Sequence, residues 1–435
     1  MGREAPTAVM RKAQSGHWLP RFHWFRPGRL VCVIGKGKVM RRKTLDHILT
    51  RMLEQYPNLS DCNFTVGNPL QVEVDGALHP AGQEFGIGRL TPYQTEVIAL
   101  SLIDGDGRCI QQLLQHGSCD LSYQIPGLAR YRVNVFSQRE CYSVVMRRLP
   151  TTVPSVEDLQ LPPALKQIAQ EKNGIAILCG ATGSGKSTTI AAVLREINAA
   201  HPVHIVTLED PVEFVHQPIK ATFNQRELGT DFDTFANGLR AALRQAPKVI
   251  LVGEMRDRET VEIALSAAET GHLVLTTLHT VDAGQTIHRL IGMFQLEEER
   301  LIRTRLAESL RWVVAQRLLP KSSGGRVAAF EIMGTNLRVQ EAVINGEAEG
   351  KTFYDIMENA GHYGWVTFDQ SILQLYQNGT ITEKTALDYA SKRAIVNRGI
   401  DWLKSERGEK TTDIEGLKID DSYRQKLQGK DLKSW

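Results

Sequence analysis

Residues 174–200, GIAILCGATGSGKSTTIAAVLREINAA, decide the fold of the central part of the chain. A short apolar run leads into a glycine-rich loop at 180–187, which fits the pattern G-x-x-x-x-G-K-[ST] at every fixed position. After the loop, apolar residues recur at helical spacing, namely Ile190, Val193, Leu194 and Ile197. A strand before the loop and a helix after it are the context that this pattern requires, so the stretch predicts a phosphate-binding loop.

A loop of this kind binds nucleotide phosphates because glycines let backbone amides close around them. The N-terminus of the following helix adds the positive end of its dipole. We expect Lys186 to reach the β- and γ-phosphates and Ser187 to bind Mg²⁺. The predicted binding residues are Gly180, Ala181, Thr182, Gly183, Ser184, Gly185, Lys186, Ser187 and Thr188.

Downstream of the loop, short apolar runs alternate with helical patterns. These runs lie at 205–209, 248–252 and 273–277. Such alternation is typical of a parallel α/β sheet. After the turn KSSGG at 321–325, the chain is predicted to be mainly helical to about residue 400.

A second, smaller α/β domain is predicted upstream. From Met40, apolar residues at helical spacing indicate a helix, and the runs CNFTVG and LQVEVDG around the turn Asn68-Pro69 indicate strands. A helical stretch follows at 91–116, and ARYRVNVFSQRECYSVVMRRLP alternates as strands do. The fold class is α/β.

The predicted organisation has six parts. They are a disordered extension at 1–40, the small α/β domain at 41–150, a proline-rich linker at 151–163, the α/β domain of the loop at 164–345, a helical region at 346–403 and a loose charged tail at 404–435. The extension has a second reading, as an arm that docks on a membrane surface or a partner. Its aromatic residues Trp18, Phe22, Trp24 and Phe25 lie among arginines.

Three groups of titratable residues lie at the ends of the predicted strands. Glu209, Asp210 and Glu213 follow the first run, Glu254 follows the second, and His272 and His279 flank the third. The carboxyl ends of parallel strands share one crevice, so three acids and a histidine can face one nucleotide there. The alternative is that the acids are solvated or capping residues and that His272 closes a helix end.

The stretch VILVGEMRDRET at 249–260 departs from a common rule. The apolar run after a phosphate loop is expected to end in an aspartate that helps to hold Mg²⁺, but here it ends in Gly253 and the first acid is Glu254. The residues alone leave three readings open: a damaged ATPase, a non-hydrolysing binder, or a motor that places its acids differently.

The order of loop, LEDPVEF, ILVGEMRD and TGHLVLTTLHT resembles the secretion ATPases, and most closely the type IV pilus retraction (twitching-motility, PilT-like) ATPases. The resemblance covers roughly residues 42–400 and includes SDCNFTVGNPLQVEVDG and ARYRVNVF. In that family the run likewise ends in Gly-Glu, which favours an intact motor. The resemblance implies ATP and Mg²⁺ as cofactors, a RecA-like P-loop ATPase core and a smaller N-terminal PAS-like α/β domain.

The resemblance also implies roles for individual residues. Glu209 would be the general base or water-orienting acid, Glu254 would act at Mg²⁺ together with Ser187, and His279 would sense the γ-phosphate. Which glutamate is the base stays open. In the implied homohexamer, neighbouring subunits complete each site with arginines, whose guanidinium fork matches phosphate geometry. The candidates are Arg132, Arg147, Arg240 and Arg244, the last two on one predicted helix face, with Arg130 and Arg148 less favoured.

The resemblance further implies a pilus-retracting motor, cytoplasmic and peripheral at the inner membrane, with a membrane platform protein and the pilus base as partners. A net charge of +3 and no basic-aromatic stretch argue against an obligate nucleic acid, so a nucleic-acid translocase is the less favoured class. The six cysteines show no C-x-x-C pair, and no apolar run approaches the roughly 18 residues of a membrane span. NLRVQEAVINGE stands where the family usually has an AIRNLIRE-type helix. Two alternatives therefore stay open. One is an ATPase of a type II or IV secretion system, and the other is an accessory retraction paralogue that acts only as a nucleotide-gated scaffold.

Overall fold

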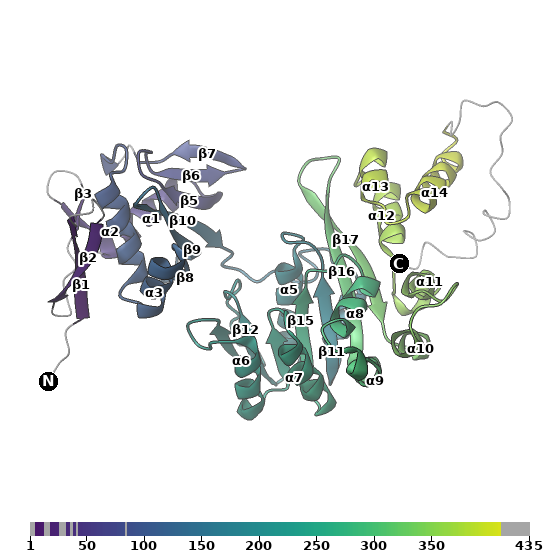
Figure 1. Cartoon of the computed structure of the whole chain (residues 1–435). Coiled ribbons are helices and arrows are strands. Elements are labelled where there is room, and N and C mark those ends of the chain that lie inside the picture. Colours follow the sequence, from purple (N-terminus) through teal and green to yellow (C-terminus); the bar gives the residue numbers. More distant parts are fainter. Residues whose placement is uncertain are drawn as a thin grey trace. The chain divides into compact units, whose positions relative to one another are not determined.

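The chain forms two compact units that divide after Thr151 (Figure 1). The computed structural model describes residues 5–12, 18–25, 32–34, 38–40, 42–82 and 85–409. Each unit has its own sheet and its own buried core. Among the helices of these residues, none is long and apolar enough to cross a membrane.

Between Arg42 and Leu149, the described residues of the first unit form three α-helices and one six-stranded antiparallel sheet. Its helices are α1 (Arg42–Gln55), α2 (Pro92–Ile103) and α3 (Gly107–His116). Its strands are β5 (Leu59–Phe64), β6 (Gln71–Val74), β7 (Ala77–Pro80), β8 (Ser118–Ile125), β9 (Ala129–Gln138) and β10 (Cys141–Leu149). The strand order is β7-β6-β5-β10-β9-β8. The helices and strands predicted for this domain are confirmed, and β7 and β8 are additional.

Strand alternation gives this sheet one apolar face. Tyr131, Val133 and Val135 of β9 are buried in the same core as Leu45 and Leu49 of α1. Polar residues occupy the alternate positions of β9 and therefore lie on the other face. The two faces of the sheet thus differ, and the more polar one carries Arg130, Arg132 and Arg147, whereas Arg148 is paired with Tyr131 on the other face.

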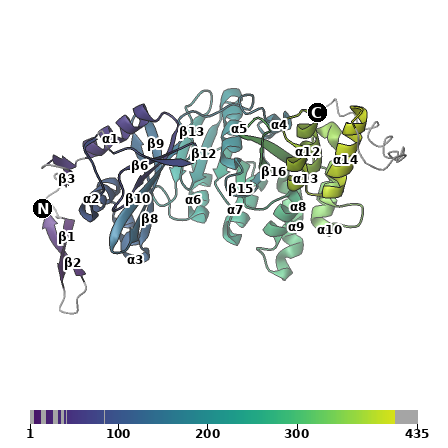
Figure 2. The same cartoon turned by 90° about the horizontal axis from the view of Figure 1, so that it is seen from above.

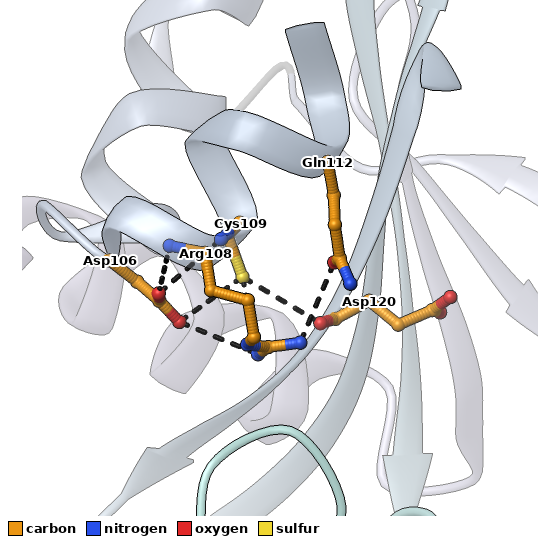
Figure 3. Close-up of polar contacts among 5 residues, drawn as sticks. All are labelled: Asp106, Arg108, Cys109, Gln112 and Asp120. Atoms are coloured by element: carbon orange, nitrogen blue, oxygen red, sulfur yellow. Dashed lines mark hydrogen bonds and ion pairs between the residues drawn. The ribbon is translucent and has the colours of Figure 1, made fainter. Parts of the chain in front are cut away.

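A polar cluster holds the start of α3 against β8 (Figure 3). The Asp106 carboxylate caps α3 by accepting from the backbone N–H groups of Arg108 at 2.9 Å and Cys109 at 3.3 Å. The Cys109 thiol donates to Asp106 at 3.3 Å and to the Asp120 carbonyl on β8 at 3.7 Å. The Arg108 guanidinium contacts Asp106 at 3.4 Å and the Gln112 amide oxygen at 3.5 Å. These contacts explain why the helical stretch 91–116 is broken into two helices with a new cap.

The backbone before Met40 forms two hairpins where the sequence predicts a disordered extension. β1 (Ala5–Lys12) pairs antiparallel with β2 (Trp18–Phe25), and β3 (Cys32–Ile34) pairs with β4 (Lys38–Met40). The other residues of 1–40 lie outside the described part. An isolated two-stranded hairpin is marginally stable in water, so disorder of this segment stays a prediction that truncation can test.

The second unit is built on a seven-stranded sheet. Its strands are β11 (Gly174–Cys179), β12 (His204–Glu209), β13 (Thr222–Glu227), β14 (Val249–Val252), β15 (Leu273–Leu278), β16 (Leu310–Pro320) and β17 (Arg326–Gly334). Their order is β13-β12-β14-β15-β11-β16-β17, and all are parallel except β17. The predicted parallel α/β sheet is confirmed.

The prediction that helices follow the turn at 321–325 is wrong for 326–334. This segment, RVAAFEIMG, is strand β17, which forms a hairpin with β16. A short apolar run fits a buried strand as well as a buried helix, so periodicity could not separate the two. The strand carries a buried carboxylate, Glu331.

Helices cover both faces of the second sheet, with α5 on one face and α6 and α7 on the other (Figure 2). The helices between strands are α4 (Ala164–Ile168), α5 (Lys186–Ala200), α6 (Phe235–Ala242), α7 (Arg258–Glu269), α8 (Ala283–Ile291) and α9 (Glu299–Ser309). The C-terminal helices are α10 (Leu337–Asn345), α11 (Phe353–Glu358), α12 (Phe368–Gln377), α13 (Glu383–Tyr389) and α14 (Arg393–Glu406). The predicted tail therefore begins inside α14, and its part from 410 to 435 lies outside the described residues.

The segment predicted as a linker packs on the second unit instead. Val156 and Leu161 are buried in that unit's core, and the Arg195 guanidinium donates to the Val153 carbonyl at 2.5 Å. Its prolines suggested a linker that packs on neither domain. The apolar residues between them are more stable when they are buried than when they are exposed to solvent. The second unit accordingly begins at Thr152 rather than at 164.

The C-terminal helices are joined to the sheet at the end of β17. Ile332 and Val366 exchange two backbone hydrogen bonds, at 2.8 and 3.1 Å. Gly334 lies so close to the Trp365 ring that a Cβ at this position would come within 2.6 Å of the indole nitrogen. Only glycine leaves the indole room to pack here.

Candidate functional site

Four neighbouring strands bring the predicted site residues to one edge of the second sheet. β12, β14, β15 and β11 lie side by side and run parallel, so their carboxyl ends meet at one edge. Glu209 ends β12, Glu254 follows β14, His279 follows β15, and the glycine loop follows β11. The shared edge predicted from the sequence is therefore present.

The glycine loop is shaped by close contact with β16. Gly180 and Gly185 have positive φ angles of 149° and 90°. A Cβ on Gly180 would come within 2.5 Å of the Gln316 carbonyl oxygen and 2.6 Å of the Ser184 hydroxyl. A Cβ on Gly185 would come within 2.8 Å of the Gln316 side-chain nitrogen. Both conformation and space therefore require glycine at these two positions.

Lys186 is buried at the mouth of this loop. Its ammonium group donates to the carbonyl oxygens of Gly180 at 2.8 Å and Ala181 at 3.0 Å. Burial lowers the pKa of Lys186, while the nearby carboxylates of Glu213 and Glu254 act to raise it. The ammonium and the two acids therefore share one electrostatic environment beside the glycine loop.

Glu254 and His279 lie together beside the loop. Glu254 is only 9 % exposed, and its Oε2 atom lies 2.6 Å from the Arg256 Nε and 3.7 Å from the His279 Nε2. The Thr277 hydroxyl donates to the Gly253 carbonyl at 2.5 Å, which ties the end of β15 to the residue before Glu254. The acid is held in place by burial and by Arg256, and the half-exposed imidazole lies beside it.

Gly253 explains why the acid is displaced by one residue. Its N–H donates to the Leu208 carbonyl at 2.7 Å, and a Cβ on Gly253 would lie 2.9 Å from that same oxygen. An aspartate at 253 would therefore collide with the end of β12. Close approach of two strand ends requires glycine there and puts the acid at 254.

Glu209 is held by hydrogen bonds from side chains of β12 and β13. Its Oε1 atom accepts from the Thr207 hydroxyl at 2.6 Å and from the Gln225 amide at 3.1 Å. Thr207 lies on β12 and Gln225 on β13, and these two strands are the farthest in the sheet order from β11, which the loop follows, on that side. Glu209 thus ends a strand of the site edge but is positioned by different neighbours from those of Glu254.

The residues present fit a magnesium ion of the type that bridges nucleotide phosphates. Ser187 in the first turn of α5 offers a hydroxyl oxygen and Glu254 offers a carboxylate, both ligand types that Mg²⁺ accepts. Within the described ranges no cluster of three or more His, Cys, Asp or Glu could hold a metal. That donor set suits Mg²⁺ in particular, because Mg²⁺ takes most of its ligands from water and phosphate oxygens. Ser184 adds a buried hydroxyl with no hydrogen-bond partner among these residues.

His272 does not belong to the site. It lies at the amino end of β15, and its Nδ1 atom is 2.9 Å from the Ala267 carbonyl and 3.3 Å from the Thr270 hydroxyl. These contacts close the C-terminal end of α7. The alternative reading of His272 as a helix-end residue is confirmed.

Arg240 and Arg244 differ from the prediction that they share a helix face. Arg240 lies near the end of α6 and pairs with Glu259 on α7, whereas Arg244 is exposed in a short 3₁₀ turn beyond the helix. The α-helix ends at Ala242 because Pro247 follows closely and Ala246 takes a left-handed conformation with φ 51°. The two guanidinium groups are therefore presented by different structures.

Arg132 and Arg147 lie in the first unit. They are direct partners across β9 and β10 on the polar face of the sheet. Arg147 donates to the buried Asp61 carboxylate on β5 at 2.9 Å, and the Arg132 Nε lies 4.0 Å from Asp120 on β8. Arg147 is 70 % exposed despite this pair. The less favoured arginines contact local oxygens: Arg130 contacts the Ser122 hydroxyl and Arg148 the Pro57 carbonyl.

Sequence reasoning missed Gln316. This residue is buried in β16, accepts from the Thr189 hydroxyl at 2.8 Å, and forms the wall against which Gly180 and Gly185 pack. The available signal was an amide inside the apolar run VVAQRLL, where a polar side chain needs a buried partner.

The family model "Type II/IV secretion system protein" matches residues 112–399. The type IV pilus retractation ATPase PilT of Pseudomonas aeruginosa is 39 % identical over 335 residues, which are 76 % of this chain and 94 % of PilT. A twitching motility protein of Neisseria gonorrhoeae is 44 % identical over 71 % of this chain and 82 % of its own length. The type IV pilus ATPase PilU of P. aeruginosa is 37 % identical over 76 % of this chain and 85 % of PilU.

Among solved structures, the pilus retraction motor PilT with bound ADP is similar to this fold. Its TM-score is 0.73 at 39 % identity, with 80 % of this chain and 99 % of that chain covered. These matches span both units, and they include the loop, the Gly-Glu run and the histidine segment described above. The chain belongs to the type II/IV secretion system protein family, in its branch of PilT-like type IV pilus retraction ATPases.

Proposed function

We propose that this protein is a hexameric motor that hydrolyses ATP to drive type IV pilus retraction. The observation that carries the proposal is the placement of Glu254 and His279 beside Lys186 and the glycine loop, at the edge where four parallel strands end. Gly253 keeps that geometry intact, so the missing aspartate is compatible with an active site. Two relatives that each match 76 % of this chain, PilT and PilU, are named as pilus ATPases.

Each residue at the edge has a role in hydrolysis under this proposal. The loop amides and Lys186 hold the β- and γ-phosphates and neutralise the charge that develops on them. A carboxylate, from Glu209 or Glu254, accepts the proton of the water that attacks the γ-phosphorus. His279 lies next to Glu254 and senses whether the γ-phosphate is present.

Magnesium fits the same scheme. Ser187 and Glu254 would hold it, and Glu254 would act through a water molecule because its carboxylate is already paired with Arg256. When bound, Mg²⁺ supplies positive charge to the phosphate oxygens. This chain's own residues then have to orient the water and the phosphates.

The ring itself is part of the proposal. Arg132, Arg147, Arg240 and Arg244 would complete the site of a neighbouring subunit in a homohexamer. Arg147 and Arg244 are exposed, as a contact with a neighbour requires. The motor would work in the cytoplasm at the inner membrane, with a platform protein and the pilus base as partners and with no obligate nucleic acid.

A second candidate is an accessory retraction paralogue. The 37 % identity to PilU is close to the 39 % identity to PilT, which supports keeping this reading. The helix NLRVQEAVINGE, which departs from the usual retraction sequence, supports it too. An accessory protein would need another motor to retract pili, whereas a motor would act alone.

The test has a biochemical arm and a cellular arm. The purified chain should hydrolyse Mg-ATP, and single-stranded DNA should not stimulate it. Expressed in a bacterium that lacks its retraction ATPases, it should restore twitching, while the Glu254→Gln variant made at the same level should not. ATP hydrolysis without restored twitching would favour the accessory or secretion reading, and stimulation by DNA would favour a translocase.

A further inference from the structure

A buried carboxylate outside the predicted site contacts the helix that follows the histidine segment, residues 279–282. Glu331 on β17 is 3 % exposed and was not singled out by any motif. The strands β15, β11, β16 and β17 are neighbours, and their pairing aligns Leu278, Cys179, Ala315 and Glu331 in one row across the sheet. Side chains in one row of a sheet lie on the same face. Glu331 thus lies on the same face as Cys179, three strands away from β15, the strand that His279 follows.

Two helices begin at this carboxylate. The backbone N–H of Ala283, the first residue of α8, donates to the Glu331 Oε1 at 2.9 Å. The backbone N–H of Phe368, the first residue of α12, also faces this carboxylate and acts to lower its pKa. A helix N-terminus has unpaired N–H groups and the positive end of a dipole, so one carboxylate can satisfy both ends.

The α8 end is continuous with the histidine segment. Only His279 to Asp282 separate β15 from α8. Asp282 caps α8, its carbonyl accepts from the Thr286 hydroxyl at 2.7 Å, and the Thr280 and Thr286 hydroxyls lie 2.6 Å apart. A shift of the first residue of α8 would therefore move this four-residue connection, and His279 with it.

The α12 end belongs to the C-terminal helices. The Arg317 guanidinium lies 3.8 Å from the centre of the Phe368 ring and donates to the Tyr389 carbonyl at 2.9 Å. Glu331 therefore lies where the sheet, the histidine segment and the C-terminal helices meet. Removing it would leave the buried N–H of Ala283 without its acceptor, which costs more than losing an exposed bond.

We propose that Glu331 is a positioning residue for the ATPase reaction: it holds the start of α8, and so the place of His279, and links that place to α12. The proposal rests on the proposed function, because it assigns His279 its role there. Glu331 does not itself contact nucleotide in this scheme. It acts by limiting the movement of the connection between β15 and α8.

The protonation of Glu331 supports a pH-dependent form of this role. Burial raises the pKa of Glu331 to about 7, while the N–H groups of Ala283 and Phe368 oppose that rise. The charged and titratable groups that face it are Asp282 at the N-cap of α8, Arg317 on β16 and Cys179 on β11. An ionised carboxylate binds both helix ends more strongly than a protonated one, so the connection should be held more tightly as the pH rises through about 7.

The first measurement does not depend on activity. Hydrogen–deuterium exchange of peptides covering 279–286 should rise about tenfold in Glu331→Ala and remain near the wild-type rate in Asp369→Asn. Asp369 is the matched control, since it is equally buried but binds the backbone N–H groups of Ser391 and Lys392 rather than α8. Unchanged exchange at 279–286 in folded Glu331→Ala would overturn the proposal, even if the wild-type chain proved inactive.

The second measurement uses turnover. Glu331→Ala should lower kcat about tenfold or more with KM changed less than about twofold, because the loop that binds the phosphates is untouched. Combined with His279→Ala, it should cause little further loss, since both changes remove one function. Glu331→Gln, which keeps one acceptor and the side-chain volume, should recover most of kcat and lose the wild-type inflection near pH 7. Fully additive losses in the double variant would show that Glu331 does not act through His279.

Discussion

The carboxyl edge of the second sheet and the polar face of the first sheet both carry acids and basic side chains, but they hold them differently. At the edge, Lys186 is buried under carbonyl oxygens and Glu254 is buried beside His279. On the polar face, Arg147 is largely exposed and pairs with one buried carboxylate, Asp61. The buried side chains of the edge have the fixed geometry that catalysis needs. The exposed arginine of the polar face can instead move and contact another molecule.

The largest expected effect concerns the edge. Lys186→Ala should weaken ATP binding by about a hundredfold or more and abolish turnover, because it removes the buried cation that faces the phosphates. Binding of a fluorescent ATP analogue and phosphate release measure the two quantities. Lys248→Ala, at the opposite end of β14, is the control and should behave as wild type. Tight ATP binding by Lys186→Ala would remove the basis for the phosphate site.

The next effect separates the two glutamates of the edge. Glu209→Gln and Glu254→Gln should each keep nucleotide binding and lose about a hundredfold or more in kcat, since each amide replaces a carboxylate without changing its size. The variant with the larger loss at saturating Mg²⁺ identifies the base. If Glu209→Gln hydrolysed ATP at the wild-type rate, the catalytic role would belong to Glu254 alone.

A third experiment asks whether exposed arginines act on a neighbour. Inactive Arg240→Ala and inactive Lys186→Ala subunits, mixed at equal amounts, should regain part of the wild-type activity. In some interfaces of the mixed ring an intact loop meets an intact arginine. Mixtures of each variant with itself are the controls. Activity that never exceeds the average of the two parents would mean that Arg240 serves only its own subunit, where it pairs with Glu259.

The fourth experiment compares a buried acid from each region. Glu331 has its pKa raised from 4.5 to about 7, so the folded state binds a proton more tightly than the unfolded chain. Its contribution to stability is present at low pH and is lost as the pH rises toward 7. Glutamine does not ionise, so Glu331→Gln should not lose this contribution. The difference in free energy of unfolding, variant minus wild type, should therefore rise by roughly 3 kcal/mol between pH 4 and pH 8.

The partner variant in the first unit should behave otherwise. Asp61→Asn should lower the free energy of unfolding by about 1 kcal/mol at neutral pH, because its arginine partner is exposed. Urea unfolding at several pH values measures both variants. A pH-independent difference for Glu331→Gln would contradict the raised pKa.

The smallest effect is expected at the N-terminus. A chain that starts at Met40 should fold, assemble and hydrolyse ATP as the full chain does. Ordering the earlier residues would cost roughly 1–2 kcal/mol of backbone entropy each, with little periodic apolar surface to offset it. Native mass spectrometry and turnover compare the two chains. Loss of the ring would show that the segment is structural, and loss of liposome binding alone would show that it is a docking arm.

The sequence predicted the edge well because its chemistry demands particular residues at particular places. Lys186 after a glycine loop and Glu254 after a buried strand are readable since phosphate binding tolerates few substitutes. The role of Glu331 could not be predicted, because its partners come from distant helices. For Gln316 the sequence offered a signal, an amide inside an apolar run, but it did not identify the partner, Thr189, which lies 127 residues away. The prediction that Arg240 and Arg244 share a helix face was wrong for a local reason. Pro247 follows closely, and the helix ends at Ala242, before the second arginine.

The contact between Gly334 and Trp365 suggests a genetic tool. Gly334→Ala would force the indole ring to shift, at a cost typical of overpacking, about 1–3 kcal/mol, without touching the nucleotide edge. Such a lesion, far from the chemistry and modest in size, is the kind that yields a temperature-sensitive allele. Cells carrying it could assemble pili at a permissive temperature and then be shifted, so that the loss of this protein is timed rather than permanent.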